Sequence, residues 1–173
     1  MIFEVAEHAQ KKNRRTGTPG GEERMRYRSN MVNLCVDVCD GGVLQGKLYH
    51  LYTREPVPFL SLFQAMKRMN ELYDDLRFPT SSTVPRSFSA GQRLRKQAVG
   101  RTEPAGRGKE RKEEETLDRM LGRRGKRGTF LIRVQYRQHS SWQGEVTWVE
   151  GGKKEYFRSA LELAGLLGSA LAI

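Results

Sequence analysis

Cysteine and histidine are scarce in this chain, and the motifs of familiar chemistry are missing. The 173 residues contain two cysteines and three histidines. No Walker loop, GxGxxG, GxSxG or HExxH sequence occurs, and no histidine has a neighbour at metal-ligand or catalytic spacing. Adjacent carboxylates occur as Asp74 and Asp75 on an expected helix, where solvated charge is the ordinary explanation. The sequence therefore predicts a protein that is not an enzyme, and it indicates no cofactor and no metal.

The two cysteines are not spaced for a disulfide, and no segment is long enough to cross a membrane. Cys35 and Cys39 lie in one expected strand, which separates their Cα atoms by roughly 13 Å. Free thiols are typical of a reducing compartment. The first nine residues do not resemble a signal peptide, and the C-terminal apolar run, Ser159–Ile173, is too short to span a bilayer. We therefore expect a cytoplasmic protein without a membrane partner.

The basic charge is concentrated outside the segments that are expected to fold. The formal net charge is +11, and residues 91–128 carry thirteen Lys and Arg against six Asp and Glu. Residues 1–30 carry seven against four, whereas residues 31–90 are neutral and residues 129–173 have an excess of one positive charge. Charge placed in this way predicts a loose, salt-sensitive attraction to nucleic acid.

Two segments show the patterning of folded structure, residues 31–79 and residues 130–173. In each, apolar residues alternate along two strands, a third extended segment follows, and an amphipathic helix begins at Ser61 or Ser159. Each segment is thus expected to be an antiparallel meander of two or three strands plus one helix. The predicted class is α+β, with two such units that either pack as a pseudo-twofold pair or stay tethered.

The remaining segments lack this patterning. Residues 1–30 are predicted to be a disordered basic arm and residues 80–129 a charged flexible linker. One alternative concerns the linker, where KERKEEETLDRML has acids before bases and Leu117, Met120 and Leu121 form a small apolar stripe. This stretch is compatible with a single helix.

The two units align without a gap at an offset of 98 residues. The matching positions are those with a structural reason to match: Gly46 and Gly144, Phe59 and Phe157, Ser61 and Ser159. Each serine begins a Ser-x-x-Gln/Glu capping box, and each phenylalanine precedes it by two residues. Both glycines lie in phase with core residues, where they are expected to let the helix approach the sheet. The offset indicates an internal repeat.

Few residues qualify as a binding surface. Arg133, Arg137 and Arg158 are candidates for contact with an anion or an acidic partner. Trp142 and Trp148 are expected in the core or between the units, and His50 is expected to fill a core position. The outward strand positions would be Cys35, Asp37, Cys39, Gln45, Lys47 and Tyr49 in the first unit, and Arg133, Gln135, Arg137, Gln143, Glu145 and Thr147 in the second. Because Tyr49 is the one aromatic among them, stacking of single-stranded RNA bases is disfavoured.

The string TFLIRVQYRQHSSWQGEVTWVEGGKKEYFRSALELAGLLGSAL resembles small bacterial proteins of Firmicutes that share a WQGxVxW…FRSALEL pattern. The string MVNLCVDVCDGGVLQGKLYHLYTREPVPF is similar to short clostridial proteins. The resemblance implies that the two units occur as separate proteins elsewhere, so that this chain is either a fusion or a read-through. It implies no activity.

Together these patterns predict a small cytoplasmic interaction or regulatory protein without catalytic activity, acting through self-association or a protein partner. The alternative is non-specific binding of nucleic acid through the basic linker and arm.

Overall fold

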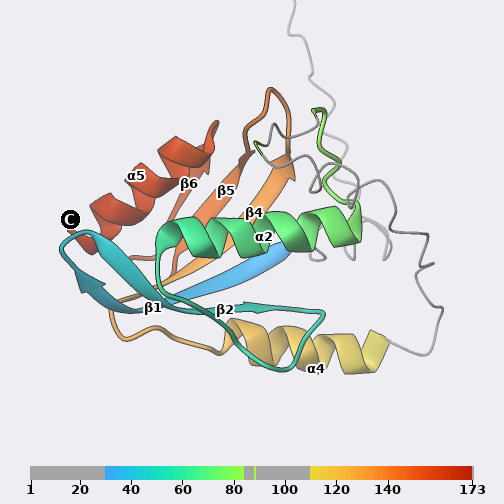
Figure 1. Ribbon diagram of the computed structural model, residues 1–173. Coiled ribbons are helices and arrows are strands. Elements are labelled where there is room, and N and C mark those ends of the chain that lie inside the picture. The colour runs from blue at the N-terminus through green and yellow to red at the C-terminus, as the bar shows by residue number, and fades with distance from the viewer. Residues whose placement is uncertain (1–29, 84–87, 89–109, 173) are drawn as a thin grey trace, which may run out of the picture.

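The strands of the described residues form one six-stranded antiparallel sheet (Figure 1). The computed structural model describes residues 30–83, 88 and 110–172. The strand order is β3-β2-β1-β4-β5-β6. The bounds are β1 (Met31–Asp40), β2 (Val43–His50), β3 (Val57–Phe59), β4 (Gly128–Tyr136), β5 (Gln143–Trp148) and β6 (Lys153–Phe157). The predicted α+β class is confirmed, and the two meanders join edge to edge through β1 and β4.

Two helices cover one face of this sheet and a third lies on the other face (Figure 1). Helices α2 (Leu62–Leu76) and α5 (Ala160–Leu171) share the main core with the inward side chains of the strands. Helix α4 (Glu110–Leu121) lies on the opposite face. The buried residues of α2 are Ala65, Met69 and Tyr73, and those of α5 are Leu163, Leu167 and Leu171. These sets differ by the repeat offset, so the repeat extends to the buried face of each helix.

Both core helices begin at a capping box. The Ser61 hydroxyl accepts a hydrogen bond from the backbone N of Gln64 at 3.1 Å, and the Gln64 side chain accepts one from the backbone N of Leu60 at 2.7 Å. The Ser159 hydroxyl accepts from the backbone N of Glu162 at 3.0 Å. Each serine satisfies an amide that the helix itself leaves unpaired, which is worth about 1 kcal/mol.

The pairing of β1 with β4 obeys the repeat offset. In its register Val32 lies opposite Ile132, and Asn33 lies opposite Leu131. Asn33 and Leu131 are themselves 98 residues apart, so they are equivalent positions of the two units. The pseudo-twofold axis therefore passes between these two residues, at the centre of the sheet.

Each unit has a β-bulge at the same place in its first strand. The register of β1 on β2 shifts between Val36 and Val38, and that of β4 on β5 shifts between Val134 and Tyr136. A bulge adds one residue to one strand and reverses the phase of the side chains beyond it. Val38 is consequently 46% exposed and Tyr136 58% exposed. Both side chains continue the apolar alternation of their strands, which predicts them to face the core, and the bulge is the reason that this prediction is wrong.

The repeated glycines sit beside the bulges and admit a neighbouring strand. A Cβ on Gly144 would lie 2.1 Å from the carbonyl O of Arg133 and 3.0 Å from the ring of Phe157. Gly46 has the same surroundings, with a cross-strand carbonyl at 2.0 Å and the ring of Phe59 at 3.1 Å. The close neighbours are thus a backbone carbonyl and an aromatic ring, where the sequence suggested a helix.

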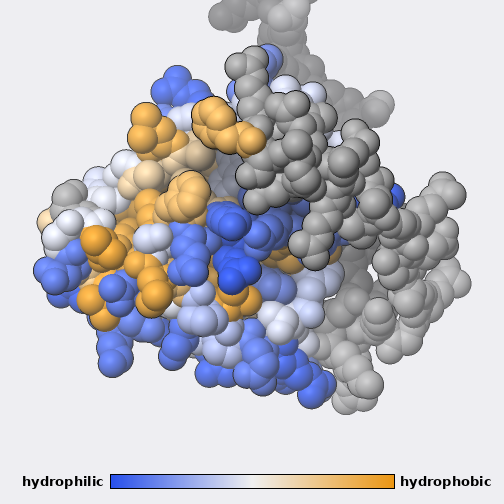
Figure 2. Space-filling view, viewed as in Figure 1, coloured by the Kyte–Doolittle hydropathy of each residue, from blue (hydrophilic) through white to orange (hydrophobic). Residues whose placement is uncertain are grey.

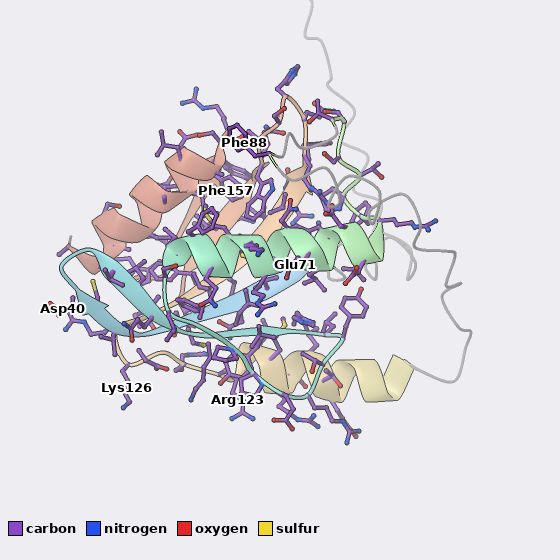
Figure 3. All side chains as sticks on the ribbon, viewed as in Figure 1. Asp40, Glu71, Phe88, Arg123, Lys126 and Phe157 are labelled. Atoms are coloured by element: carbon purple, nitrogen blue, oxygen red, sulfur yellow. The ribbon has the colours of Figure 1, made fainter. Side chains whose placement is uncertain are left out.

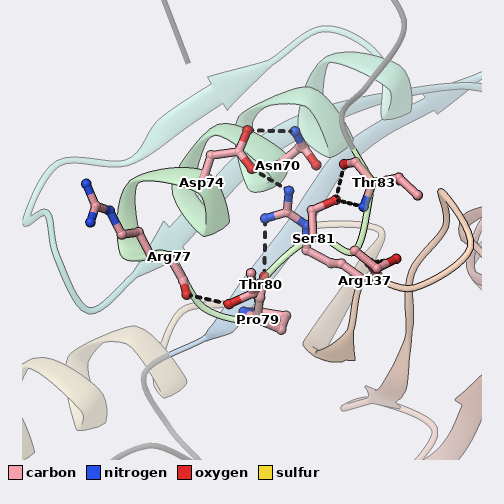
Figure 4. Close-up of polar contacts among 9 residues, drawn as sticks. Asn70, Asp74, Arg77, Pro79, Thr80, Ser81, Thr83 and Arg137 are labelled. Carbon is pink, nitrogen blue, oxygen red and sulfur yellow. Dashed lines mark hydrogen bonds and ion pairs between the residues drawn. The ribbon is translucent and has the colours of Figure 1, made fainter. Parts of the chain in front are cut away.

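Unit 2 is also anchored to the helix of unit 1. The rings of Tyr73 and Trp142 meet edge to face at 5.8 Å between centroids. The guanidinium of Arg137, 4% exposed, pairs with Asp74 and donates to the carbonyl O of Pro79 at 3.3 Å (Figure 4). A hydrogen-bonded guanidinium buried against α2 fixes the β4–β5 hairpin there. The units therefore pack together and are not merely tethered.

Part of the expected linker belongs to this folded body. Residues 110–121 are helical, Leu117 and Met120 are buried, and β4 begins at Gly128. At the other end of the segment, the backbone N of Ser82 donates to the carbonyl O of Arg137 at 3.0 Å. The boundaries of 80 and 129 were wrong, because tertiary contacts order a polar sequence that local patterning leaves open. The expected arm, residues 1–29, and residues 84–87 and 89–109 lie outside the described residues.

A substitution at the repeated glycine tests the cross-strand packing. We expect Gly144→Ala to lower the free energy of unfolding by about 1–3 kcal/mol, because the added methyl collides with a backbone carbonyl that cannot move aside. The matched control is Gly165→Ala on α5, where a Cβ meets nothing within 4 Å, so that helix propensity alone should raise stability by about 0.5–1 kcal/mol. Urea unfolding followed by circular dichroism measures both. Equal effects of the two changes would contradict the packing described.

Candidate functional site

Helix α4 is held on the sheet by an asparagine at the pseudo-twofold axis. The Asn33 side chain is fully buried, and its Nδ2 donates to the carbonyl O of Met120 at 2.6 Å and of Arg123 at 3.2 Å. These carbonyls lie at the C-terminal end of α4, where a helix leaves its acceptors unpaired. The equivalent position in unit 2 is Leu131, which offers no donor. The polar anchor therefore breaks the symmetry of the repeat and places α4 over unit 1.

The chain after α4 crosses the bulge of β1 in close contact. The backbone N of Arg127 donates to the carbonyl O of Val36 at 2.8 Å, and the backbone N of Lys126 donates to the carboxylate of Asp37 at 3.2 Å. A Cβ on Gly125 would lie 2.5 Å from the backbone N and O of Val36. Only glycine permits this approach. Residues 122–128 are thus fixed against the sheet.

This anchoring presents a row of cations on the outer surface. We call it the basic ridge and define it by five exposed side chains: Arg119, Arg123, Arg124, Lys126 and Arg127. Figure 3 shows Arg123 and Lys126 pointing outward on the α4 side. Within the part of the chain that the structure describes, none of the ion pairs involves a member of the ridge. Nη1 of Arg124 also donates to the carbonyl O of Leu121 and, at 2.9 Å, to that of Arg123. Clustered cations that have no carboxylate at ion-pair distance among the described residues create a positive potential that attracts an anionic partner.

A small notch opens beside the ridge, between α4 and the end of β2. Its enclosed volume is about 10 Å³. It is lined by Tyr49, His50, Thr53, Arg54, Thr116, Arg119, Met120 and Arg123. The guanidinium of Arg123 lies 5.5 Å from the centroid of the Tyr49 ring, a cation–π contact that holds the arginine across the strand. Among the described residues that line it, none is a carboxylate.

The three arginines proposed from the sequence lie apart from the ridge and from one another. Arg133 pairs with Glu145 at 3.1 Å, directly across the β4–β5 ladder. Arg137 is buried against α2, because the bulge removes it from the outer face. Arg158 is exposed and pairs with Glu162 at 3.1 Å. Each of the three therefore has a carboxylate partner within the protein, and their contact with an outside anion or partner stays a prediction.

The outer face of unit 1 also differs from its predicted composition. Cys35, expected to be exposed, is 1% exposed beneath the α4 segment, and its Sγ donates to Oδ1 of Asn33 at 3.5 Å. Burial is the main cause that raises the pKa of this thiol to about 12, and the charge of Asp37 adds to it. Cys39 is partly buried, and both cysteines are free thiols. Cys35 is therefore kept in its unreactive form.

Trp148 forms part of a second hollow, on the core face. This hollow measures about 250 Å³ and lies between α5 and the strands β4, β5 and β6. It is lined by Phe130, Val146, Trp148, Lys153, Glu155, Leu166, Ser169 and Ala170. Trp142, by contrast, is buried against Tyr73. Its polar lining residues are Lys153, Glu155 and Ser169, and its volume is below the ~300 Å³ usual for a ligand site.

The ridge could be only partly anticipated from the sequence. The concentration of charge in residues 91–128 was evident, but it was assigned to a spacer. The signals that α4 docks are the apolar stripe of Leu117 and Met120 and the glycine at 125, which allows close passage over a strand. No group of three metal-binding side chains is found among the residues that the structure describes. In the same part of the chain, every helix is too short or too polar to cross a membrane.

The burial of Cys35 gives a direct test of the docked helix. In the native protein we expect a thiol reagent to modify Cys39 well before Cys35. Asn33→Ala should raise the labelling rate of Cys35 about tenfold or more, because the two hydrogen bonds that join α4 to β1 are lost and α4 detaches more often. Asn70→Ala, on the opposite face, is the matched control and should have no such effect. Peptide mass spectrometry separates the two cysteines, and equal native labelling of both would refute the docked position.

Comparison with known proteins gives no relative for this chain: no family model, no curated protein and no solved structure matches it. The functional conclusion therefore rests on the geometry of the ridge and the notch, and the resemblance to bacterial proteins of Firmicutes stays a prediction.

Proposed function

We propose that this chain is a small, non-enzymatic interaction protein that binds nucleic acid through the sugar–phosphate backbone. The observation that carries the proposal is the basic ridge: five exposed cations, without ion-pair partners among the described residues, on a segment fixed to the sheet. Fixed cations bind phosphates with a smaller loss of conformational freedom than cations on a free tail. The sequence predicted that nucleic acid binds to the basic linker and arm, and the proposal limits the binding surface to residues 119–127.

The same surface favours binding that does not depend on base sequence. Recognition of single-stranded bases uses two or three exposed aromatic rings on a sheet. Tyr49 lies under the Arg123 guanidinium, and Tyr156, 67% exposed, lies on the edge strand β6 with Lys154 Nζ 5.7 Å from its ring centroid. These rings are far apart in the strand order, so they form no common stacking platform. Contacts to phosphate position a nucleic acid without reading its sequence.

A cytoplasmic location accompanies this proposal. Both cysteines are free thiols, and such thiols are maintained in a reducing compartment. Fractionation of cells that express the chain tests the location, and recovery in a membrane or extracellular fraction would contradict it.

Self-association or a protein partner stays a prediction. Apolar side chains are exposed at equivalent positions of the core helices, Phe63 at 77% and Leu161 at 83%. Figure 2 shows apolar surface gathered around α5 and the β1–β2 hairpin, where Val38 and Val43 are each 46% exposed. Light scattering of the purified protein decides whether this surface joins two copies.

Salt titration of nucleic-acid binding tests the proposed function. We expect log K to fall steeply with log salt, and the triple change Arg123→Ala, Arg124→Ala and Arg127→Ala should reduce that slope by about 2–3, because each lost phosphate contact contributes about 0.7–0.9. The measurement is fluorescence anisotropy with a labelled oligonucleotide.

The control removes the same charge from the opposite face, through Lys67→Ala, Arg68→Ala and Arg158→Ala. These three side chains are exposed on or beside the core helices. The control should retain the wild-type slope. An equal loss in both triple variants would assign binding to net charge alone, and no binding at low salt would exclude the function.

A further inference from the structure

The notch beside the ridge collects an unusual set of groups from three parts of the chain. Tyr49 and His50 come from β2, Thr53 and Arg54 from the segment that follows it, and Thr116, Arg119, Met120 and Arg123 from α4 and its end. Arg119 and Arg123 are four residues apart, the spacing that places side chains on one side of a helix. Arg54 lines the same notch from the segment after β2. Three arginines therefore border the notch, and no carboxylate is among the described residues that line it.

The size of the notch limits what it can hold. An enclosed volume of about 10 Å³ admits about one water-sized group. A base or a sugar is far larger and is excluded. One oxygen of a tetrahedral anion fits inside, while the remaining oxygens stay at the mouth, within reach of the exposed arginines. Guanidinium groups match the geometry of phosphate oxygens with paired hydrogen bonds.

His50 borders the notch at the end of β2 without adding a charge. Its Nδ1 accepts a hydrogen bond from the backbone N of Tyr52 at 3.2 Å, and burial lowers the pKa of the imidazole, which favours the neutral ring. The charge at the notch therefore comes from the arginines.

The notch belongs to one unit only, so it is not a by-product of the repeated fold. In unit 2 the equivalent of His50 is Trp148, whose ring packs on Gly151, where a Cβ would lie 2.1 Å from it. The equivalent of Asn33 is Leu131, and no helix corresponding to α4 lies over the described part of that unit. The notch exists because the asparagine anchors α4.

We infer that this notch binds a phosphate monoester dianion, the terminal phosphate of a nucleic-acid strand, whose backbone then continues along the basic ridge. The inference rests on the proposed function and deepens it. A terminal phosphate carries more charge than an internal phosphodiester and has three unsubstituted oxygens. Three arginines around a notch of this size match the higher charge and the free oxygens of the terminal group better than an internal phosphodiester.

The test compares oligonucleotides of one sequence that end in a 5′-phosphate, a 3′-phosphate or hydroxyls only. We expect the wild-type protein to bind one phosphorylated form about tenfold more tightly than the hydroxyl form, a difference typical of one added charge-assisted contact. Arg54→Ala should abolish that ratio and leave binding of the hydroxyl form within about twofold, because Arg54 lies outside the ridge. Arg54→Lys keeps the charge but lacks the paired planar donors of the guanidinium, so this variant should retain only part of the preference for the phosphorylated form.

A ridge variant separates this inference from the proposed function. Arg127→Ala should weaken all three oligonucleotides equally and preserve the ratio between them. Equal affinity of the wild-type protein for all three forms would overturn the notch and leave the ridge intact.

A second experiment identifies the source of the phosphate. Inorganic phosphate is titrated against the protein at constant ionic strength, and the His50 ring resonances are followed by NMR. A saturable shift that Arg54→Ala removes, in a protein that binds no oligonucleotide, would keep the phosphate site and assign it to a small phosphate. The absence of any shift, together with no preference among oligonucleotides, would overturn the site.

Discussion

The pairing of β1 with β4 is the contact on which the rest of the molecule depends. Either meander alone would have an open hydrogen-bonding edge and a helix with too little surface to cover, which is marginal for units of this size. Joined at the axis between Asn33 and Leu131, they form one sheet with one core. The hairpin of unit 2 then reaches α2, where Trp142 and Arg137 are buried. Both units are stabilised by contacts that neither has alone.

The candidate site arises where the chain departs from that symmetry. Leu131 and Asn33 occupy equivalent positions, yet only the asparagine can donate to the end of a helix. Its two hydrogen bonds fix α4 on one half of the outer face, and the bulge of β1 fixes the chain that follows. A segment with the composition of a spacer thereby becomes an ordered surface. The side-chain amide of Asn33 fixes the position of the positively charged segment. The pairing of β1 with β4 in turn fixes the position of Asn33.

The sequence predicted the features that local chemistry determines. Capping serines, alternating strands and the offset of 98 depend on residues near one another in the chain, so the units and their class could be derived from it. The bulges could not, because an extra residue is defined only against the partner strand. The surroundings of two arginines could not be predicted for a related reason. Arg133 pairs with Glu145 because of the strand register, and Arg137 points to the other face because of a bulge. The hydrogen bond that anchors α4 joins two residues separated by 87 positions in the sequence. Local sequence patterning gives no information on contacts at such a separation.

The central claim is that β1 and β4 pair in one continuous sheet, and hydrogen–deuterium exchange measured along the chain tests it most directly. Buried ladder amides exchange through cooperative opening, so strands that pair should open together. The account predicts that amides of residues 31–36 and 128–133 exchange slowest and lose protection at the same denaturant concentration. Protection retained in β4, β5 and β6 while β1 exchanges freely would show that the units fold separately, and would contradict the account.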